Sequence, residues 1–141
     1  MEFVEVETKE DIMAAGQLVR TIAPDVLCGP ALHSFLCDIE HKIRLAMEND
    51  TEYYLVCRQG PVGYAALVNE GDCLAVKQIG FTPGWRRKGL LKRTLAFLAE
   101  TYDPPLIRID GWGKEQPALE ALGFHKREDV NFYVYEKIFY V

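Results

Sequence analysis

The chain has 141 residues, a length that predicts one domain spanning residues 1–141. Hydrophobic residues make up 49% and charged residues 26% of the chain, which is ordinary for a globular protein and argues against a disordered, collagen-like, coiled-coil or disulfide-scaffold chain. The formal net charge of −5 conceals an uneven distribution, because the segment from Cys73 to Ala99 has six basic residues and no Asp or Glu. The rest of the chain has ten basic and twenty-one acidic residues. One basic patch on an acidic chain argues against bulk nucleic-acid or membrane binding and favours a small anionic ligand.

The sequence has no apolar run long enough to cross a membrane and no signal-peptide hydrophobic region at its N-terminus. These features predict a soluble, cytoplasmic protein. The four cysteines form no CxxC pair, and a domain of this size folds without disulfides, so we expect free thiols.

The first half of the chain predicts a strand, two helices and a hairpin. Phe3–Val6 alternates as a strand does, and Thr8 and Asp11 then form a capping box for a helix that ends before Pro24. A second helix is predicted after Gly29 and Pro30, because apolar residues recur at helical spacing from Leu32 to Met47. Strands follow at 53–57 and 62–68, joined by a turn at Gln59-Gly60-Pro61.

The second half predicts strands that alternate with helices. The predicted elements are a strand at 73–81, a loop at 84–89, a helix at 89–102 with Leu91, Leu95 and Leu98 facing the core, a strand at 106–109, a helix at 115–122 with Gly123 as its C-cap, and a strand at 131–139. Strand-helix-strand units beside antiparallel hairpins indicate a mixed α/β sheet with helices on its faces.

The basic patch lies in a loop between a predicted strand and a predicted helix. Arg86, Arg87 and Lys88 precede Gly89, at which the helix begins. The first backbone N–H groups of a helix have no partners, and the helix dipole adds positive potential there, so a phosphate binds well at this place. Three basic residues at a helix N-terminus are otherwise unfavourable, which indicates that an anion lies among them.

This loop has three other interpretations. A Walker A loop needs Lys and Ser or Thr after its second glycine, whereas Gly89 is followed by Leu90 and Leu91. A dinucleotide fold needs a G-x-G-x-x-G motif, which is absent. The third is a solvated basic helix start that holds no ligand.

The loop resembles motif A of the GCN5-related N-acetyltransferase (GNAT) superfamily, which has the pattern Arg/Gln-x-x-Gly-x-Gly/Ala. The matching residues are Arg86-Arg87-Lys88-Gly89-Leu90-Leu91, and the last departs from the pattern. The stretch 118–124 is similar to the family's helix that ends in Leu-Gly-Phe, and Tyr135–Ile138 resembles its last strand. The order of predicted elements also matches, so the resemblance covers nearly the whole chain.

The resemblance implies a splayed sheet that holds acetyl-CoA between the strands 73–81 and 106–109. The backbone of Ile79 and Phe81 would bind the pantetheine arm, and the amides from Arg87 to Leu91 would hold the pyrophosphate. A glycine within a strand often marks a bulge, so Gly80 is expected to form the family's bulge, which aims an N–H at the thioester oxygen. The cofactor-binding residues implied are therefore Ile79, Phe81, Arg86, Arg87, Lys88, Gly89, Leu90 and Leu91.

The catalytic groups of the family are not found at their usual positions. Relatives carry a Glu or His base near the positions of Ala75 and Lys77, and a Tyr acid at the position of Leu119. Trp112 takes the place of a common Asn. Glu70, Asp72 and Tyr135 are alternatives that are more typical of turn or surface residues. The catalytic residues therefore stay unknown, and transfer by positioning and water alone is a further option.

Other residues form weaker candidate sites. His33, Cys37 and His41 have the spacing of one helix face and would suit a metal, but no carboxylate completes the set, so no metal is predicted. Cys73 is a nucleophile or, more simply, a buried thiol. Alternating aromatic residues between Phe132 and Tyr140 would form core on one side, and a homodimer contact or the wall of an acceptor pocket on the other.

The sequence thus predicts an acetyl-CoA-dependent N-acetyltransferase that moves the acetyl group directly from the thioester to a primary amine. The acidic remainder favours a cationic acceptor, such as a polyamine, an aminoglycoside-like amine or a protein amino group. The alternative is a catalytically weak or inactive module of the same fold that binds acetyl-CoA and regulates a protein partner. Nucleic-acid binding through the basic patch is the third hypothesis.

Overall fold

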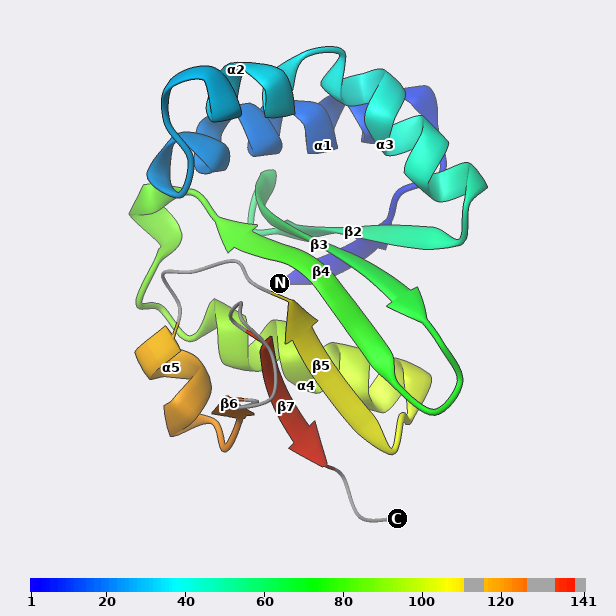
Figure 1. The fold of residues 1–141 in the computed structure, drawn as a ribbon, viewed down its shortest axis with the longest axis vertical. Helices are drawn as coiled ribbons and strands as arrows, with labels where there is room; N and C mark the ends of the chain where they lie inside the picture. The colour runs from blue at the N-terminus through cyan, green and yellow to red at the C-terminus, as the bar shows by residue number, and fades with distance from the viewer. Residues whose placement is uncertain (111–115, 127–133, 139–141) are drawn as a thin grey trace.

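The computed structural model describes residues 1–110, 116–126 and 134–138, and within them a mixed sheet carries helices on both faces (Figure 1). The elements in chain order are β1 Glu2–Glu5, α1 Lys9–Ile22, a 3-10 turn Ala23–Asp25, α2 Gly29–Leu36, α3 Ile39–Glu48, β2 Thr51–Cys57, β3 Pro61–Asn69, β4 Leu74–Phe81, a 3-10 turn Pro83–Trp85, α4 Leu90–Tyr102, β5 Leu106–Asp110, α5 Gln116–Ala121, β6 His125–Lys126 and β7 Val134–Ile138. The predicted mixed α/β class is confirmed.

The described strands form one seven-stranded sheet in the order β1-β2-β3-β4-β5-β7-β6. Neighbouring strands are antiparallel except for β4 and β5, which are parallel and are joined through α4. A parallel pair needs such a crossover connection, whereas the antiparallel pair β2 and β3 is joined by a tight turn.

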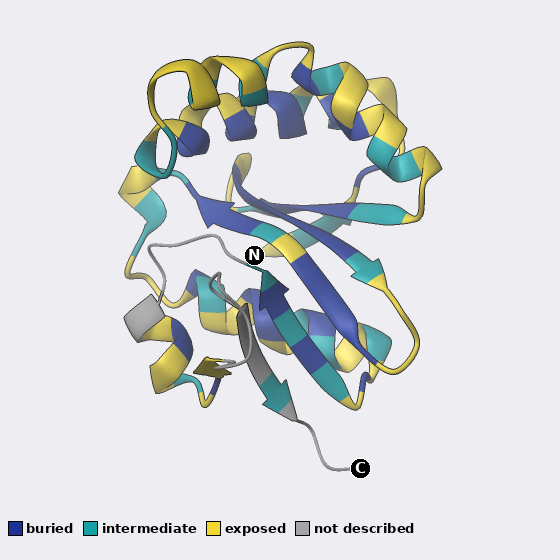
Figure 2. Ribbon diagram, in the orientation of Figure 1, coloured by how far each residue is buried: buried dark blue, intermediate teal, exposed yellow. Residues whose placement is uncertain are grey.

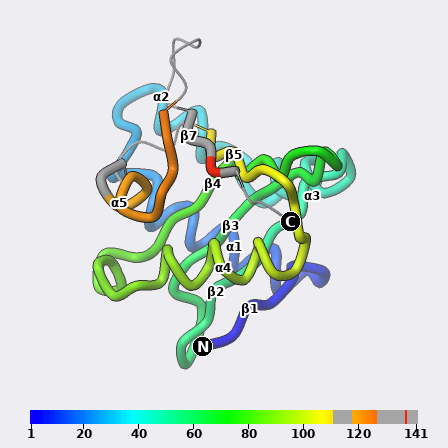
Figure 3. The backbone as a smooth tube through the Cα atoms, turned by 90° about the horizontal axis from the view of Figure 1, so that it is seen from below, coloured from blue at the N-terminus to red at the C-terminus, as the bar shows by residue number. Residues whose placement is uncertain are grey.

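Two hydrophobic cores lie on the two faces of the sheet. On one face, residues of α1 and α3 such as Val19 and Ile43 pack against Tyr64 of β3. On the other face, α4 lies across the sheet (Figure 3) and buries Leu95 and Leu98 against strand residues. The strands between the helix layers are mostly buried (Figure 2). The strands β2 and β3 are therefore covered on both faces, whereas the core formed by α1 and α3 has no described residue of β5.

Local sequence signals set the ends of two helices as predicted. Thr8 and Asp11 form the capping box of α1: the Asp11 N–H donates to Thr8 Oγ1 at 3.1 Å, and the Thr8 N–H donates to Asp11 Oδ2 at 3.1 Å. Gly123, with φ of +90°, follows α5, and the Phe124 N–H donates to the Leu119 carbonyl at 3.0 Å. This bond completes a glycine-dependent C-terminal motif that only a left-handed residue supports.

The single helix predicted after Gly29 and Pro30 is wrong, because the chain breaks it into α2 and α3. Asp38 adopts a left-handed conformation with φ of 51°, which no continuous helix accommodates. The Lys42 ammonium then donates to the Ser34 carbonyl at 2.6 Å, so it satisfies the freed end of α2. No residue of α2 is fully buried.

Smaller differences concern boundaries. The first strand is displaced by one residue, a 3-10 turn occupies the start of the predicted loop, and β6 was not predicted. Leu90, rather than Leu91, is the buried residue of the first turn of α4. The predicted ends Glu115, Asn131 and Phe139 lie outside the described residues. No helix among the described residues is long and apolar enough to cross a membrane.

Candidate functional site

The parallel strands β4 and β5 separate part of the way along their length. They pair at three positions, Leu74↔Ile107, Ala75↔Arg108 and Val76↔Ile109, and no further. In Figure 1 the two strands begin close together and their arrowheads lie apart. We call this opening the wedge, and the end at Val76 and Ile109 its vertex.

A β-bulge coincides with the vertex. Ala66 of β3 pairs with Gln78, whereas Leu67 pairs with Val76, so Lys77 is the extra residue of β4. A bulge bends its strand and increases the local twist. The bulge at Lys77 therefore explains why β4 turns away from β5 immediately after Val76.

The prediction of a bulge at Gly80 is wrong. Gly80 pairs with Tyr64 in regular register. The neighbouring Gly63 of β3 is the position that needs a glycine. A Cβ on Gly63 would lie 2.3 Å from a Phe81 ring carbon and 2.7 Å from the Gly80 carbonyl oxygen. The glycine at 63 thus serves close packing of β3 on β4.

Beyond the bulge, one edge of β4 faces the wedge with its backbone groups. The Thr82 N–H donates to the Val62 carbonyl at 2.9 Å, and alternate residues of an antiparallel strand bond the same neighbour. The register therefore directs Gln78 and Gly80 toward β3, and Ile79 and Phe81 toward the side of β5. Among the described residues no strand pairs with β4 on that side at Ile79 and Phe81, so the edge is free to accept an added strand-like chain.

The N-terminus of α4 lies at the wide end of the wedge. The first bond of this helix runs from the Arg93 N–H to the Gly89 carbonyl at 3.2 Å, and no side chain caps the helix start. The N–H groups of Leu90, Leu91 and Lys92 therefore have no acceptor within the helix. Gly89 has φ of +78°, and a Cβ there would meet nothing within 4 Å. The backbone at Gly89 is thus both left-handed and open to a ligand.

A cavity of about 600 Å³ adjoins these amides. Its walls come from the end of α1 and the following turn, the end of β4, the loop before α4, the start of α4, and α5. The cationic residues that line it are Arg86, Arg87 and Lys92. The cavity therefore combines positive charge with unpaired backbone donors, which is the chemistry that binds phosphate.

Arg86 has a structural partner within this wall. Its guanidinium lies 2.5 Å from Asp25 Oδ2 and donates through Nε to the Phe81 carbonyl at 3.0 Å. These contacts tie the loop to the turn after α1 and to the end of β4. Arg87, with φ of 62°, and Lys92 are both exposed. Their positive charges are therefore more accessible to a ligand than that of Arg86.

The structure brings most of the predicted cofactor residues together. Six of the eight, Phe81, Arg86, Arg87, Gly89, Leu90 and Leu91, line the cavity. Ile79 lies on the free edge of β4 instead, and Lys88 is exposed in the loop. Leu91, the departure from the family pattern, lines the cavity, and its backbone N–H stays without a helical acceptor.

The positions of the family's acid and base hold neither its Tyr nor its Glu or His: Leu119 takes the place of the acid, and Ala75 and Lys77 lie where the base is expected. Ala75 is fully buried, and Leu119 is 4% exposed within the core around α4. Of the alternatives, Asp72 is exposed in the turn before β4, and Glu70 contacts Arg108. Tyr135 pairs through its backbone with Ile109, and its side chain, like Trp112, lies outside what the structure describes.

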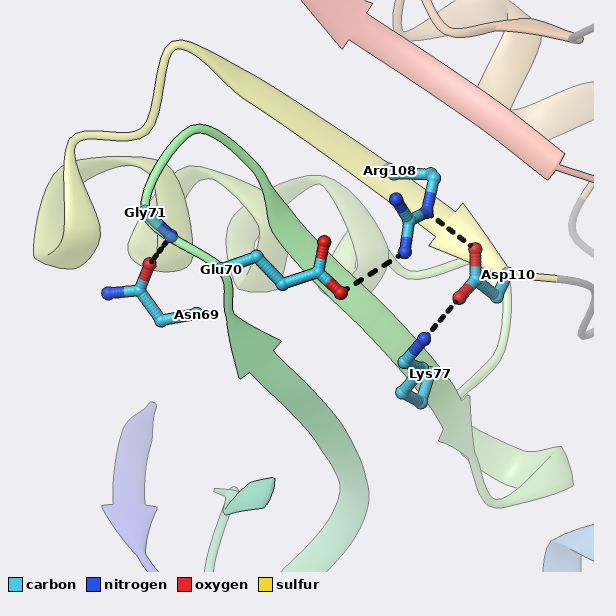
Figure 4. A network of polar contacts seen from close by, with 6 residues as sticks. All are labelled: Asn69, Glu70, Gly71, Lys77, Arg108 and Asp110. Atoms are coloured by element: carbon cyan, nitrogen blue, oxygen red, sulfur yellow. Dashed lines mark hydrogen bonds and ion pairs between the residues drawn. The ribbon is translucent and has the colours of Figure 1, made fainter. Parts of the chain in front are cut away.

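A charged network, which sequence analysis did not identify, lies at the vertex (Figure 4). The Lys77 ammonium is 2.8 Å from Asp110 Oδ2, and Arg108 Nε is 3.0 Å from Asp110 Oδ1. Arg108 also lies 3.5 Å from Glu70 Oε1. Burial raises the pKa of Asp110, but the bonds from Lys77 and Arg108 outweigh burial and hold that pKa below its ordinary value. The carboxylate therefore stays ionised near neutral pH.

The metal and nucleophile alternatives lose support. The break at Asp38 separates His33 on α2 from His41 on α3, so the helical spacing that would have grouped them with Cys37 does not apply. The described part of the chain has no cluster of three or more His, Cys, Asp or Glu side chains able to hold a metal ion. Burial raises the pKa of the Cys73 thiol, which makes it a poor nucleophile.

No protein-family model matches this sequence, and no curated protein is detectably similar to it in sequence. Its structure, in contrast, is similar to many solved acetyltransferases. The PaiA N-acetyltransferase of Thermoplasma acidophilum, solved in complex with coenzyme A, has a TM-score of 0.76 at 12% identity, and the match covers 99% of this chain and 100% of that chain.

Two further neighbours give the same result. GCN5 of Tetrahymena has a TM-score of 0.75 at 10% identity, covering 99% of this chain and 97% of that chain. An aminoglycoside 6′-N-acetyltransferase complexed with coenzyme A has a TM-score of 0.73 at 11% identity, covering 98% of this chain and 97% of that chain. The fold is therefore that of the GNAT acetyltransferases, and the fold expected from the motif resemblance is confirmed.

Proposed function

We propose that this protein is an acetyl-CoA-dependent N-acetyltransferase, with residues 1–141 as a single catalytic domain. The observation that carries the proposal is the free edge of β4, which opens beside the uncapped N-terminus of α4. Two structural neighbours with the same fold were solved with coenzyme A. We expect the backbone of Ile79 and Phe81 to bind the pantetheine arm, and the amides of Leu90 and Leu91 to bind the pyrophosphate.

The described residues suit this donor. The pyrophosphate needs donors and positive charge, which α4 supplies through its free amides and Lys92, and the preceding loop through Arg87. The arm needs an edge with amide and carbonyl groups turned away from the sheet, which β4 supplies after the bulge through Ile79 and the Phe81 N–H, whereas the Phe81 carbonyl already accepts from Arg86 Nε. Bound acetyl-CoA would supply an activated acyl group, and the chain would hold it still for the acceptor.

The acceptor would approach from the face of the sheet opposite α4. Ile107 and Ile109 point into the core around α4, so Arg108 and Asp110 lie on the other face by the alternation of the strand. A primary amine is the proposed acceptor, and the acidic remainder of the chain favours one that carries positive charge. The four free cysteines suit the cytoplasmic location that the sequence predicts.

A second candidate is a module that binds acetyl-CoA without turnover and acts on a protein partner. Leu119, at the position of the family's acid, and Ala75 and Lys77, near the position of its base, favour it because none of them is the Tyr, Glu or His that relatives use for proton transfer.

One experiment separates the two candidates. The purified protein is mixed with acetyl-CoA and a panel of polyamines, aminoglycosides and lysine peptides, and free thiol is measured over time. We expect at least one amine to release thiol faster than buffer alone. Binding of acetyl-CoA without amine-dependent thiol release would favour the module, and absence of binding at millimolar acetyl-CoA would exclude both candidates.

A further inference from the structure

The vertex of the wedge is closed by an ion pair between its two strands. Val76 and Ile109 form the last pair of β4 and β5, and the next residue on each strand is Lys77 or Asp110. Their side chains meet at 2.8 Å across the point where the strands separate (Figure 4). Any chain that lies along the free edge of β4 and runs toward the vertex therefore ends at this pair.

The direction of a bound donor follows from the proposed function, on which this inference rests. The phosphate-binding amides of α4 lie beyond Phe81, at the wide end of the wedge. The pantetheine arm would then run from Phe81 past Ile79 toward Lys77, about 13 Å along the strand. The sulfur is at the far end of that arm, so it would come to rest at the vertex.

The charges at the vertex differ in how far a ligand can reach them, although two cations and two carboxylates make the network formally neutral. Lys77 and Arg108 share the single carboxylate of Asp110, and Glu70 reaches only the outer side of Arg108, at 3.5 Å. The side chain of Lys77 is 41% exposed, whereas those of Asp110 and Arg108 are 23% and 22% exposed. Lys77 is therefore the cation that a ligand can reach, and Asp110 fixes its position.

We propose that the Lys77 ammonium, held by Asp110, faces the sulfur of the donor and stabilises the thiolate that leaves during acyl transfer. In this reaction the acceptor nitrogen forms a bond to the thioester carbonyl carbon, and the C–S bond breaks. The electron pair of that bond stays on sulfur, the amine loses its proton to water, and the thiolate later takes a proton from water. Lys77 thus offsets the negative charge that develops on sulfur as the C–S bond breaks.

The test uses bound coenzyme A itself, so it needs no knowledge of the acceptor. An opposite charge within about 4–6 Å lowers the pKa of an acidic group by about 1–3 units. The pKa of the bound thiol is measured from thiolate ultraviolet absorbance against pH, with desulfo-coenzyme A as the blank that removes the signal of the protein's own thiols and tyrosines. We expect the thiol bound to the native protein to have a pKa about one unit or more below that of free coenzyme A.

Two variants form a matched pair. Lys77→Met should keep the Kd for coenzyme A within about threefold of the native value, since Lys77 contacts no phosphate, but should return the thiol pKa toward that of free coenzyme A. Lys92→Met, at the other end of the wedge, should weaken binding and leave the thiol pKa unchanged. Lys77→Arg, which keeps the charge, should restore most of the shift, and thermal unfolding checks that each variant folds.

The outcomes separate this inference from the function on which it rests. Coenzyme A that binds with the same thiol pKa in the native protein and in Lys77→Met would overturn the role of Lys77 and leave the cofactor site standing. No binding of coenzyme A to the native protein would overturn both.

Discussion

Asp110 shows how much of the candidate site depends on a residue without a local signal. It follows a predicted strand as an ordinary acidic residue, and nothing near it in the sequence marks it. Only the parallel pairing of β5 with β4, together with the bulge at Lys77, brings the two side chains within 2.8 Å. The phosphate loop was predictable because all its residues lie within one short segment, whereas the vertex network joins residues more than thirty positions apart.

Asp110 is expected to stabilise the folded protein at neutral pH and to lose this effect in acid. Its pKa in the folded protein lies below the ordinary value of 3.8, so the folded state holds the ionised carboxylate more strongly than the unfolded state does. This stabilisation is fully present above that ordinary value and is lost as the pH falls through the lower, folded-state pKa. Asp110→Asn should therefore lower the unfolding temperature most at neutral pH and progressively less in acid. Melting curves at several pH values check this, and an equal loss at neutral and acid pH would contradict it.

At the scale of elements, helices were predicted better than the details of strands. The capping box at Thr8 and the glycine at 123 are local signals, and the structure confirms both. The break at Asp38 was missed because the apolar spacing continues through it, and the Lys42 ammonium that stabilises the break is four residues further on. The bulge was expected at Gly80, but it depends on the pairing of β3 with β4, which residue type alone does not determine.

Along the free edge of β4, coenzyme A is expected to protect alternate backbone amides from hydrogen exchange. If coenzyme A adds to this edge, it should slow hydrogen exchange at the Ile79 and Phe81 amides. The Gln78 and Gly80 amides face β3 and should be protected with or without the ligand, so they serve as internal controls. Exchange measured by NMR on the free and bound protein tests the alternation. Slowing that was equal at all four amides would indicate general rigidification rather than an added strand.

At the scale of the whole molecule, the sheet carries one hydrophobic core on each face. Leu98 of α4 is fully buried in one of them. Leu98→Ala should lower the free energy of unfolding by about 2–5 kcal/mol, because it leaves a cavity in a packed core. Leu45→Ala is the matched control, since Leu45 on α3 is 43% exposed and its loss should change stability by at most about 0.5 kcal/mol. Denaturant unfolding measures both, and similar losses for the two variants would contradict the assignment of the core.

The basic segment from Cys73 to Ala99 extends over both ends of the wedge in the folded molecule. Five of the six cations in the acid-free segment lie from Arg86 to Arg93, around the N-terminus of α4. The sixth is Lys77, at the vertex of the wedge. One basic segment thus flanks both ends of the proposed donor site, and that arrangement depends on the sheet rather than on the sequence order alone.

Coenzyme A is proposed to bind at Gly89 and the start of α4, and calorimetric titration of acetyl-CoA tests this claim most directly. Gly89→Glu would add a negative charge beside the phosphates and a side chain over the free amides. Gly84→Glu adds the same charge in the same loop, where the residue is exposed and does not line the cavity. Gly89→Asn is a neutral control, because Asn tolerates the left-handed conformation that Gly89 adopts.

We predict saturable binding of acetyl-CoA to the native protein, similar binding to Gly84→Glu, and no detectable binding to Gly89→Glu when its thermal unfolding shows that it is folded. Absence of heat from the native protein at millimolar acetyl-CoA, or equal affinity of the native protein and Gly89→Glu, would contradict the claim.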